Sequence, residues 1–170
     1  MTETMTKAIN DQIHSELSAY YSYLAMSAHC DRAGFPGAAK WLRLQSGEEQ
    51  IHAMKLLDFL LARHAKVDLK GLTPPKIEYN SLLDVFQTSF KQEQAVSAQI
   101  EALYELAFKE KSYPTVVQLE WFLNEQVEEE KTCREIVAKL TMVGSDPASL
   151  LEIDRELGAR VGETRKPAAG

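Results

Sequence analysis

The sequence has few cysteines, no long apolar run and no excess of positive charge, and each absence argues against a class of protein. Only two cysteines occur, Cys30 and Cys133, with no CxxC pair, which argues against a disulfide framework and favours a reducing compartment. No stretch stays uncharged long enough to cross a bilayer, and the first residues lack the apolar core of a secretory signal. We therefore expect a cytoplasmic protein that does not associate with membranes.

The acidic balance of the chain restricts its partners. With a formal net charge of -6 at pH 7 and a pI near 5.3, the protein lacks the basic face that nucleic-acid binding requires. A cationic ligand suits this charge better. At 170 residues and 45% hydrophobic composition, the chain is long enough for one domain with a sizeable core, and we expect residues 1–170 to form a single domain.

Glycine and proline are grouped at a few points and leave long helical segments between them. The interruptions lie at residues 32–37, 65–80, 111–114 and 143–147, and no alternation typical of strands competes with the helical spacing. Five helices are therefore predicted, the last capped by Ser145 or Asp146 and followed by a frayed tail over 162–170. Their expected ranges are 5–33, 37–65, 81–111, 114–143 and 146–160.

The lengths of the connections define the expected fold. The first and third connections are short, so the helices that they join are antiparallel neighbours. The second, with Gly71, Pro74 and Pro75, is long enough to run the length of a bundle. The prediction is an all-α fold, a four-helix bundle with one long crossover connection and a short fifth C-terminal helix.

Each long helix places polar groups on or beside its apolar stripe. In the segment "GEEQIHAM" (47–54), His52 points into the stripe of the second helix, and Glu49, three residues earlier, lies beside it. On the third helix, Glu93 lies almost at the centre of the stripe. The other polar groups are Glu16 and Tyr23, which flank a first-helix stripe of Ile13, Leu17, Tyr20 and Leu24, and Gln126 and Glu129 in the fourth-helix stripe.

Four acids and a histidine directed at the core require positive charge. An isolated ionised carboxylate in an apolar interior costs many kcal/mol, so buried acids are paired or bind metal. No lysine or arginine is predicted near the centre of the four stripes at this level. Divalent cations are the simplest source of the missing charge, and mixed oxygen and nitrogen ligands suit iron or manganese better than calcium.

This pattern resembles the ferritin family, and more closely its non-haem bacterial branch. The resemblance rests on Glu16 and Tyr23, "EEQIH" (48–52), "KQEQ" (91–94) and "WFLNEQVEEEK" (121–131), and it extends over nearly the whole chain. It implies a ferroxidase that oxidises Fe(II) with dioxygen and stores ferric mineral inside a shell of 24 identical subunits. The catalytic residues that it implies are Glu16, Tyr23, Glu49, His52, Glu93, Gln126 and Glu129.

The resemblance also implies how these residues share the iron ions. Glu49 would bridge two irons, one held with Glu16 and His52 and the other with Glu93 and Glu129. Tyr23 would be a redox-capable phenol nearby, and Gln126 would orient water or dioxygen-derived species near the second iron. A third iron site, on the inner side of the shell, would use Glu48, Glu125, Glu128 and Glu129.

The sequence differs from two other branches of the ferritin family, and each difference argues against a feature of that branch. Bacterioferritin repeats an ExxH pair on its fourth helix and carries a methionine between the acid and histidine of the second, where this chain has Gln50 and Ile51. No haem is therefore expected. Animal ferritins place acids early in the fourth helix, where this chain has Thr115, Val116 and Leu119, which counts against an acidic three-fold entry channel.

Three other functions remain open. One is a di-iron oxidase or peroxidase of the rubrerythrin type without storage, although those proteins usually append a CxxC iron domain that is absent here. Another is an interaction bundle without metal, which would leave Glu93 and Glu129 unpaired in the core. The third is a DNA-protecting mini-ferritin, whose metal site lies between subunits rather than inside one bundle.

Overall fold

The computed structural model describes residues 1–162, which form five helices and no strand. The remaining residues of the expected domain, 163–170, lie outside the described residues and include most of the tail predicted to fray. No helix among residues 1–162 is both long and apolar enough to cross a membrane. The helices are α1 (Glu3–Arg32), α2 (Pro36–Ala62), α3 (Leu82–Lys109), α4 (Tyr113–Val143) and α5 (Pro147–Gly158).

Local side-chain chemistry determines where several helices begin and end. Thr2, Ser81 and Asp146 cap α1, α3 and α5, and each accepts a hydrogen bond from the backbone N–H three residues later, at 3.1, 3.1 and 2.8 Å. These bonds satisfy donors that have no partner within the helix. α2 ends at Ala62, three residues earlier than predicted, and His64 takes a left-handed backbone with φ of 53°, which a continuing helix does not allow.

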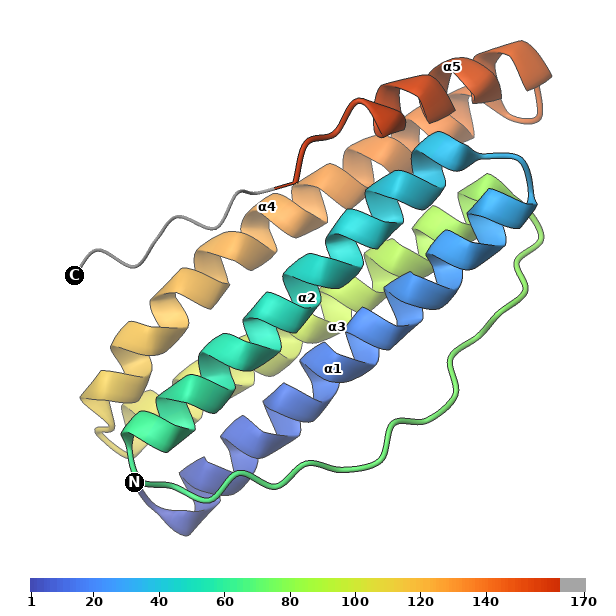
Figure 1. Cartoon of the computed structure of the whole chain (residues 1–170). Coiled ribbons are helices and arrows are strands. Elements are labelled where there is room, and N and C mark those ends of the chain that lie inside the picture. Colours follow the sequence, from blue (N-terminus) through green and yellow to red (C-terminus); the bar gives the residue numbers. More distant parts are fainter. Residues whose placement is uncertain (163–170) are drawn as a thin grey trace.

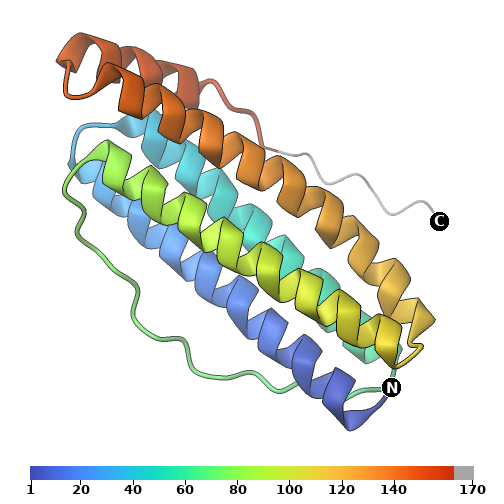
Figure 2. The same ribbon diagram turned by 180° about the vertical axis from the view of Figure 1, so that it is seen from behind.

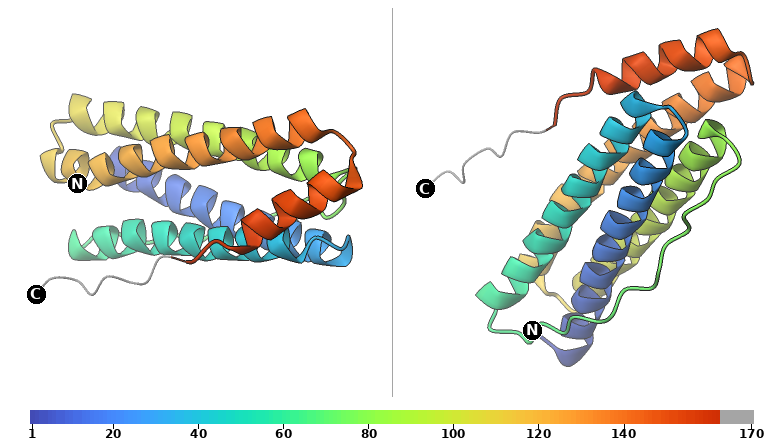
Figure 3. Two further views of the ribbon diagram at one scale, coloured as in Figure 1. Left: turned by 90° about the horizontal axis from the view of Figure 1, so that it is seen from above. Right: turned by 45° about the vertical axis from the view of Figure 1, so that its right-hand side comes forward.

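The four long helices form the predicted bundle. α1 packs on α2, and α3 packs on α4, and these two antiparallel pairs lie side by side (Figures 1 and 2). The crossover between α2 and α3 runs the length of the bundle on the α1 side (Figure 1). α5 turns back from the end of α4 and packs on α2 (Figure 3). The all-α bundle with one long crossover and a short fifth helix is therefore confirmed.

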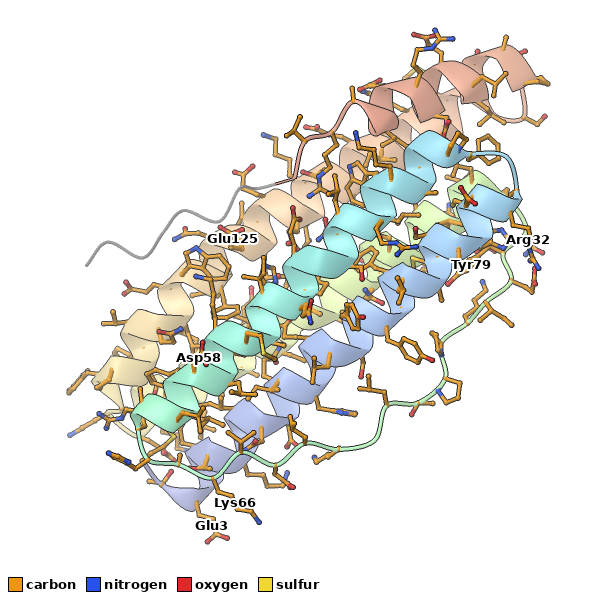
Figure 4. All side chains as sticks on the ribbon, in the orientation of Figure 1. Glu3, Arg32, Asp58, Lys66, Tyr79 and Glu125 are labelled. Carbon is orange, nitrogen blue, oxygen red and sulfur yellow. The ribbon has the colours of Figure 1, made fainter. Side chains whose placement is uncertain are left out.

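α1 holds both ends of the crossover. Near the start of the crossover, the Asn10 side chain donates to the Lys66 carbonyl at 2.9 Å and accepts from the Asp68 N–H at 2.7 Å. Near its end, Arg32 donates to Glu78 at 2.6 Å, and Figure 4 shows Arg32 close to Tyr79 at this end of the bundle. These contacts fix a segment that has no secondary structure of its own.

The apolar core consists of two clusters with a polar layer between them. One cluster, at the end that carries α5, includes Trp41 and Phe86, and the other, toward the opposite end, includes Ile13, Ile100 and Leu119. On each long helix, the stretch between its contributions to the two clusters carries a buried or partly buried acid. The four acids are Glu16, Glu49, Glu93 and Glu129.

A buried acid on α5 caps the start of α2. Phe35, the residue before α2, has no side-chain oxygen for this purpose, and Asp154 supplies it by accepting from the N–H groups of Gly37 and Ala38 at 3.1 and 2.7 Å. A carboxylate at a helix N-terminus is also favoured by the helix dipole. The approach is close because Gly37 has no side chain, and a Cβ there would lie 1.8 Å from the Asp154 carbonyl oxygen.

We predict that Gly37→Ala destabilises the protein and that Gly47→Ala does not. The first adds a methyl group that meets the α5 backbone, and overpacking of this kind costs about 1–3 kcal/mol. The second lies in the same helix with nothing within 4 Å of its Cβ position, and alanine is a better helix former by about 1 kcal/mol. Thermal unfolding of both variants checks this, and equal melting temperatures would contradict the close α2–α5 contact.

Candidate metal centre

Three residues that were predicted to lie at the edge of the buried face are fully buried in the structure. Glu16 and Tyr23 are 0% exposed on α1, whereas Leu17 and Leu24, assigned to the stripe, are only partly buried. Glu49, placed beside the stripe of α2, is 1% exposed. The prediction of a flanking position was wrong because polar residues themselves occupy the middle of the buried face, so apolar residues alone define its direction poorly.

The acids and the histidine form two groups that share one residue. Glu16, Glu49 and His52 each offer an atom, and these atoms lie within 4.8 Å of one another. Glu49, Glu93 and Glu129 form a second group by the same measure. Helices α1, α2, α3 and α4 therefore all contribute to one cluster, and Glu49 lies between its two halves.

Several atoms that face one another in this cluster have no hydrogen-bond partner. They include the Oε2 atoms of Glu16, Glu49 and Glu129 and the Nδ1 atom of His52. His52 Nδ1 lies 3.6 Å from Glu49 Oε2 and 4.0 Å from Glu16 Oε2, which is too long for a hydrogen bond. Buried polar atoms are almost always satisfied, so the arrangement fits metal ions placed between these side chains.

Among the described residues, no lysine or arginine pairs with the acids of the cluster. Over residues 1–162, no lysine or arginine lies within 4.0 Å of the carboxylates of Glu16, Glu49, Glu93 or Glu129, and His52 is their one basic neighbour at that range. This agrees with the prediction that no lysine or arginine lies at this level of the bundle; that metal ions supply the charge stays a prediction. Carboxylates with an imidazole form a ligand set for divalent transition metals.

Two glutamines each donate a hydrogen bond to one oxygen of an acid in the cluster. Gln12 donates to Glu16 Oε1 at 2.8 Å, and Gln45 donates to Glu49 Oε1 at 3.1 Å. The sequence interpretation missed both residues, although each lies four positions before its glutamate and therefore on the same side of the helix. These bonds leave the other oxygen of Glu16 and of Glu49 directed at the cluster, as expected of outer partners that orient metal ligands.

Glu93 is held by Gln126 and by a chain that begins at Tyr23. The Gln126 amide donates to Glu93 Oε2 at 3.3 Å, and the Tyr23 hydroxyl donates to Glu93 Oε1. Ser89 Oγ lies 2.8 Å from the Tyr23 oxygen and 3.3 Å from Cys133 Sγ. Because the Tyr23 proton is used for Glu93, Ser89 donates to Tyr23 and the Cys133 thiol donates to Ser89.

Burial changes the protonation of this centre. Loss of hydration raises the pKa of Glu16, and it raises the pKa values of Glu49 and Glu129 well above the usual range, with further increases from neighbouring carboxylates. Burial, reinforced by the charge of Glu93, raises the pKa of the Tyr23 phenol well above 10. Burial raises the pKa of Cys133 to about 12, so both groups remain protonated at neutral pH.

The residues expected at a third iron site line one cavity between α2 and α4. Its volume is about 710 Å³, and Glu48, Glu125, Glu128 and Glu129 all contribute to its wall. Figure 4 shows Glu125 on α4, and Glu125, Glu129 and His52 offer atoms within 4.8 Å of one another. The Glu48 carboxylate is instead bound by Arg160, whose Nη2 donates to it at 2.6 Å.

The fold and this centre together define a class of protein, a helical bundle with metal-binding carboxylate and histidine groups in its core. Comparison with known proteins gives the family. A sequence profile of the ferritin-like domain matches residues 6–143. The chain belongs to the ferritin family, which confirms the resemblance inferred from its motifs.

Relatives and solved structures agree with this assignment. Bacterial non-heme ferritin of Staphylococcus aureus (strain USA300) is 36% identical over 160 residues, which cover 94% of this chain and 96% of the relative. That of Staphylococcus haemolyticus (strain JCSC1435) is 37% identical over the same length and coverage. An open pore ferritin from the hyperthermophilic archaeon Archaeoglobus fulgidus superposes with a TM-score of 0.93 at 38% identity, covering 95% of this chain and 99% of that one.

We predict that the metal-free protein loses stability as pH rises from 5 to 7.5. Above about pH 4.5, an unfolded glutamate releases its proton, whereas the folded forms of Glu16, Glu49 and Glu129 retain it up to their raised pKa values. The folded state binds more protons in this window, so the free energy of unfolding falls with rising pH. Carboxyls with lowered pKa values, such as Asp84, are already ionised in this pH range in both the folded and the unfolded state. They therefore do not change how the free energy of unfolding depends on pH.

Glu49→Gln is expected to reduce this pH dependence and to raise the melting temperature of the metal-free protein at pH 7.5. A gain of about 1 kcal/mol corresponds to about 2–4 °C for a chain of this size. The surface variant Glu101→Gln on α3 serves as the control. Thermal unfolding in the presence of a chelator measures both effects, and identical profiles for all three proteins would count against buried, proton-binding carboxylates.

Proposed function

We propose that this chain is an iron-storage ferritin with an intra-subunit ferroxidase centre. It oxidises Fe(II) with dioxygen and passes the ferric product to mineral inside a shell of identical subunits. The observation that carries this proposal is the pair of ligand groups that meet at Glu49, each with atoms within 4.8 Å of one another. Two ferrous ions bound side by side can deliver two electrons to dioxygen together.

The proposed roles follow from the two groups of side chains that share Glu49. Glu16 and His52 bind one ferrous ion, Glu93 and Glu129 bind the other, and Glu49 bridges them. Carboxylates stabilise the more highly charged ferric state, because hard oxygen donors and negative charge favour it. The protons on these buried acids leave as the metal enters, since metal ligands must be deprotonated.

Tyr23 and Gln126 act on the second iron through Glu93 in this proposal. Both donate to its carboxylate, which fixes the carboxylate orientation toward the neighbouring acids. Gln126 also orients water or dioxygen-derived species at this iron, and Tyr23, buried and protonated, serves as the nearby redox-capable phenol. The Ser89 and Cys133 side chains support the phenol from the other side.

Storage requires an enclosed volume that one bundle does not have, so we include a shell of 24 subunits in the proposal. Exposed apolar side chains support contacts between subunits: Val117 is 67% exposed and Val127 is 65% exposed on α4. Surfaces of this kind are typical of interfaces. The sequence places Leu123 and Val127 off the apolar stripe of α4, which predicts that both are exposed; Leu123 is instead partly buried and packs against the core.

The remaining parts of the proposal concern iron sites, haem and location. Glu48, Glu125, Glu128 and Glu129 bind a third iron in the cavity between α2 and α4. No haem is bound, because Gln50 and Ile51 occupy the two positions of α2 between Glu49 and His52, where bacterioferritin has a methionine. The protein functions in the cytoplasm, where two buried thiols, Cys30 and Cys133, remain reduced.

We predict that Glu49→Ala and His52→Ala slow aerobic Fe(II) oxidation at least tenfold. Loss of outer partners of a metal ligand already costs about 10–100-fold, and these variants remove ligands themselves. Stopped-flow absorbance of the ferric product measures the rate, with the exposed α3 residue changed in Glu101→Ala as the control. Equal rates in wild type and all three variants would remove the ferroxidase proposal.

The proposed shell can be tested separately by measuring the mass of the assembled protein. Light scattering after size exclusion should give a mass close to 24 times that of the 19.1 kDa chain. The mass should be the same for the Glu49→Ala variant, because Glu49 lies inside one bundle. A monomer with intact ferroxidase activity would contradict storage and favour a di-iron oxidase of the rubrerythrin type.

A further inference from the structure

The segment that follows α5, residues 159–162, places a cation beside the acidic cavity. Figures 1 and 3 show this segment leaving α5 and running back along α2. Arg160 and Val161 on it form part of the wall of the 710 Å³ cavity between α2 and α4. The sequence interpretation placed no cation here, because Arg160 belongs to none of the four long helices.

The Arg160 guanidinium is held at four points. Its Nη2 donates to Glu48 Oε2 at 2.6 Å, and its Nη1 donates to Gln45 Oε1 at 3.0 Å and to the Trp41 carbonyl at 3.5 Å. Its Cζ also lies 4.5 Å from the centre of the Trp41 ring. The Arg160 and Glu48 side chains are only 24% and 16% exposed, so this ion pair is shielded from much of the solvent screening that weakens surface pairs.

Arg160 also connects the cavity to the centre of the bundle. Gln45 accepts from Arg160 with its carbonyl oxygen and donates to Glu49 Oε1 with its amide nitrogen at 3.1 Å. The guanidinium has donors only, so it fixes which end of the Gln45 amide faces Glu49. One side chain from the C-terminal segment thus contacts an acid of the third site and the residue that orients the bridging acid.

Charge makes Arg160 and a metal ion competitors. Four glutamates line the cavity, and Arg160 and Lys55 are the two lysine or arginine residues lining it within the described chain. Lys55 is placed over the Trp121 ring at 4.0 Å, which leaves Arg160 as the cation that binds Glu48. A divalent ion that takes Glu48 as a ligand has to displace a charge-assisted hydrogen bond of 2.6 Å.

We propose that Arg160 controls metal binding at the third site. Its guanidinium binds Glu48 in the metal-free protein, and an incoming divalent ion displaces it from Glu48. This inference rests on the proposed function in that it requires the cavity acids to bind metal. With Arg160 in place, Glu48 is withheld from the site. When the metal enters, Arg160 leaves Glu48 and Gln45, and the segment after α5 is released from the cavity.

Calorimetric titration of the assembled, metal-free protein with Zn(II) tests the exchange without iron oxidation. Arg160→Gln should bind the third ion about tenfold more tightly than wild type, within the usual range of coupling between sites. The control Arg155→Gln breaks an exposed ion pair with Glu152 on α5 and should match wild type. Arg160→Lys should restore weak third-site binding, because it keeps the charge.

A double variant separates competition at Glu48 from a structural effect. In the Glu48→Gln background, Arg160→Gln should change Zn(II) binding no further, because the two residues act on one another. Trp41 gives a second readout: in Trp121→Phe it is the one tryptophan left, and its fluorescence should shift on addition of Zn(II) as Arg160 leaves its ring. This shift should be absent in Arg160→Gln.

The possible results decide between the two proposals. Unchanged third-site affinity in Arg160→Gln, or equal behaviour of Arg160→Lys and Arg160→Gln, would overturn the exchange and leave the ferroxidase centre intact. Failure of wild type to bind any Zn(II) at the bundle centre or in the cavity would overturn the proposed function together with this inference. Tighter third-site binding restricted to Arg160→Gln supports the exchange.

Discussion

The structure depends on how four buried carboxylates in the middle of a helical bundle are compensated. Removing an ionised carboxylate from water is costly, and here Glu16, Glu49, Glu93 and Glu129 share one layer with a single imidazole. The bundle tolerates this layer because apolar clusters on both sides supply the burial that holds the helices together. Burial raises the pKa values of Glu16, Glu49 and Glu129 in the metal-free protein, and the proposed metal ions would replace the protons that these acids retain.

The polar contacts around this layer serve one purpose, which is to orient it. Gln12 and Gln45 each bind one oxygen of a ligand acid and leave the other free. Glu93 differs, because Tyr23 donates to one of its oxygens and Gln126 donates to the other, so both fix the orientation of this carboxylate. A site whose ligands are fixed before the metal arrives loses little conformational entropy on binding. Gln45 is itself oriented by Arg160, which donates a hydrogen bond to its carbonyl oxygen.

Much of this was predictable from the sequence, because helical spacing and chain breaks are local properties. The five helices, the long crossover and the inward position of Glu93 followed from them. Glu16 and Glu49 were placed off centre, because the centre of their helix faces is polar and apolar residues mark only its margins. Arg160 was missed because its position depends on how α5 folds back on α2, a tertiary contact made through Asp154 and the backbone N–H groups at the start of α2.

The central claim is that metal ions complete the buried layer, and anomalous diffraction tests it most directly. Crystals of the protein soaked anaerobically in Fe(II) should show two adjacent peaks between the four helices, with Glu49 in contact with both. The distances from each peak to its carboxylate and imidazole ligands should be about 2.0–2.2 Å, as in other divalent metal sites. Peaks confined to the cavity beside Glu48, or no peak in the bundle centre, would contradict the account.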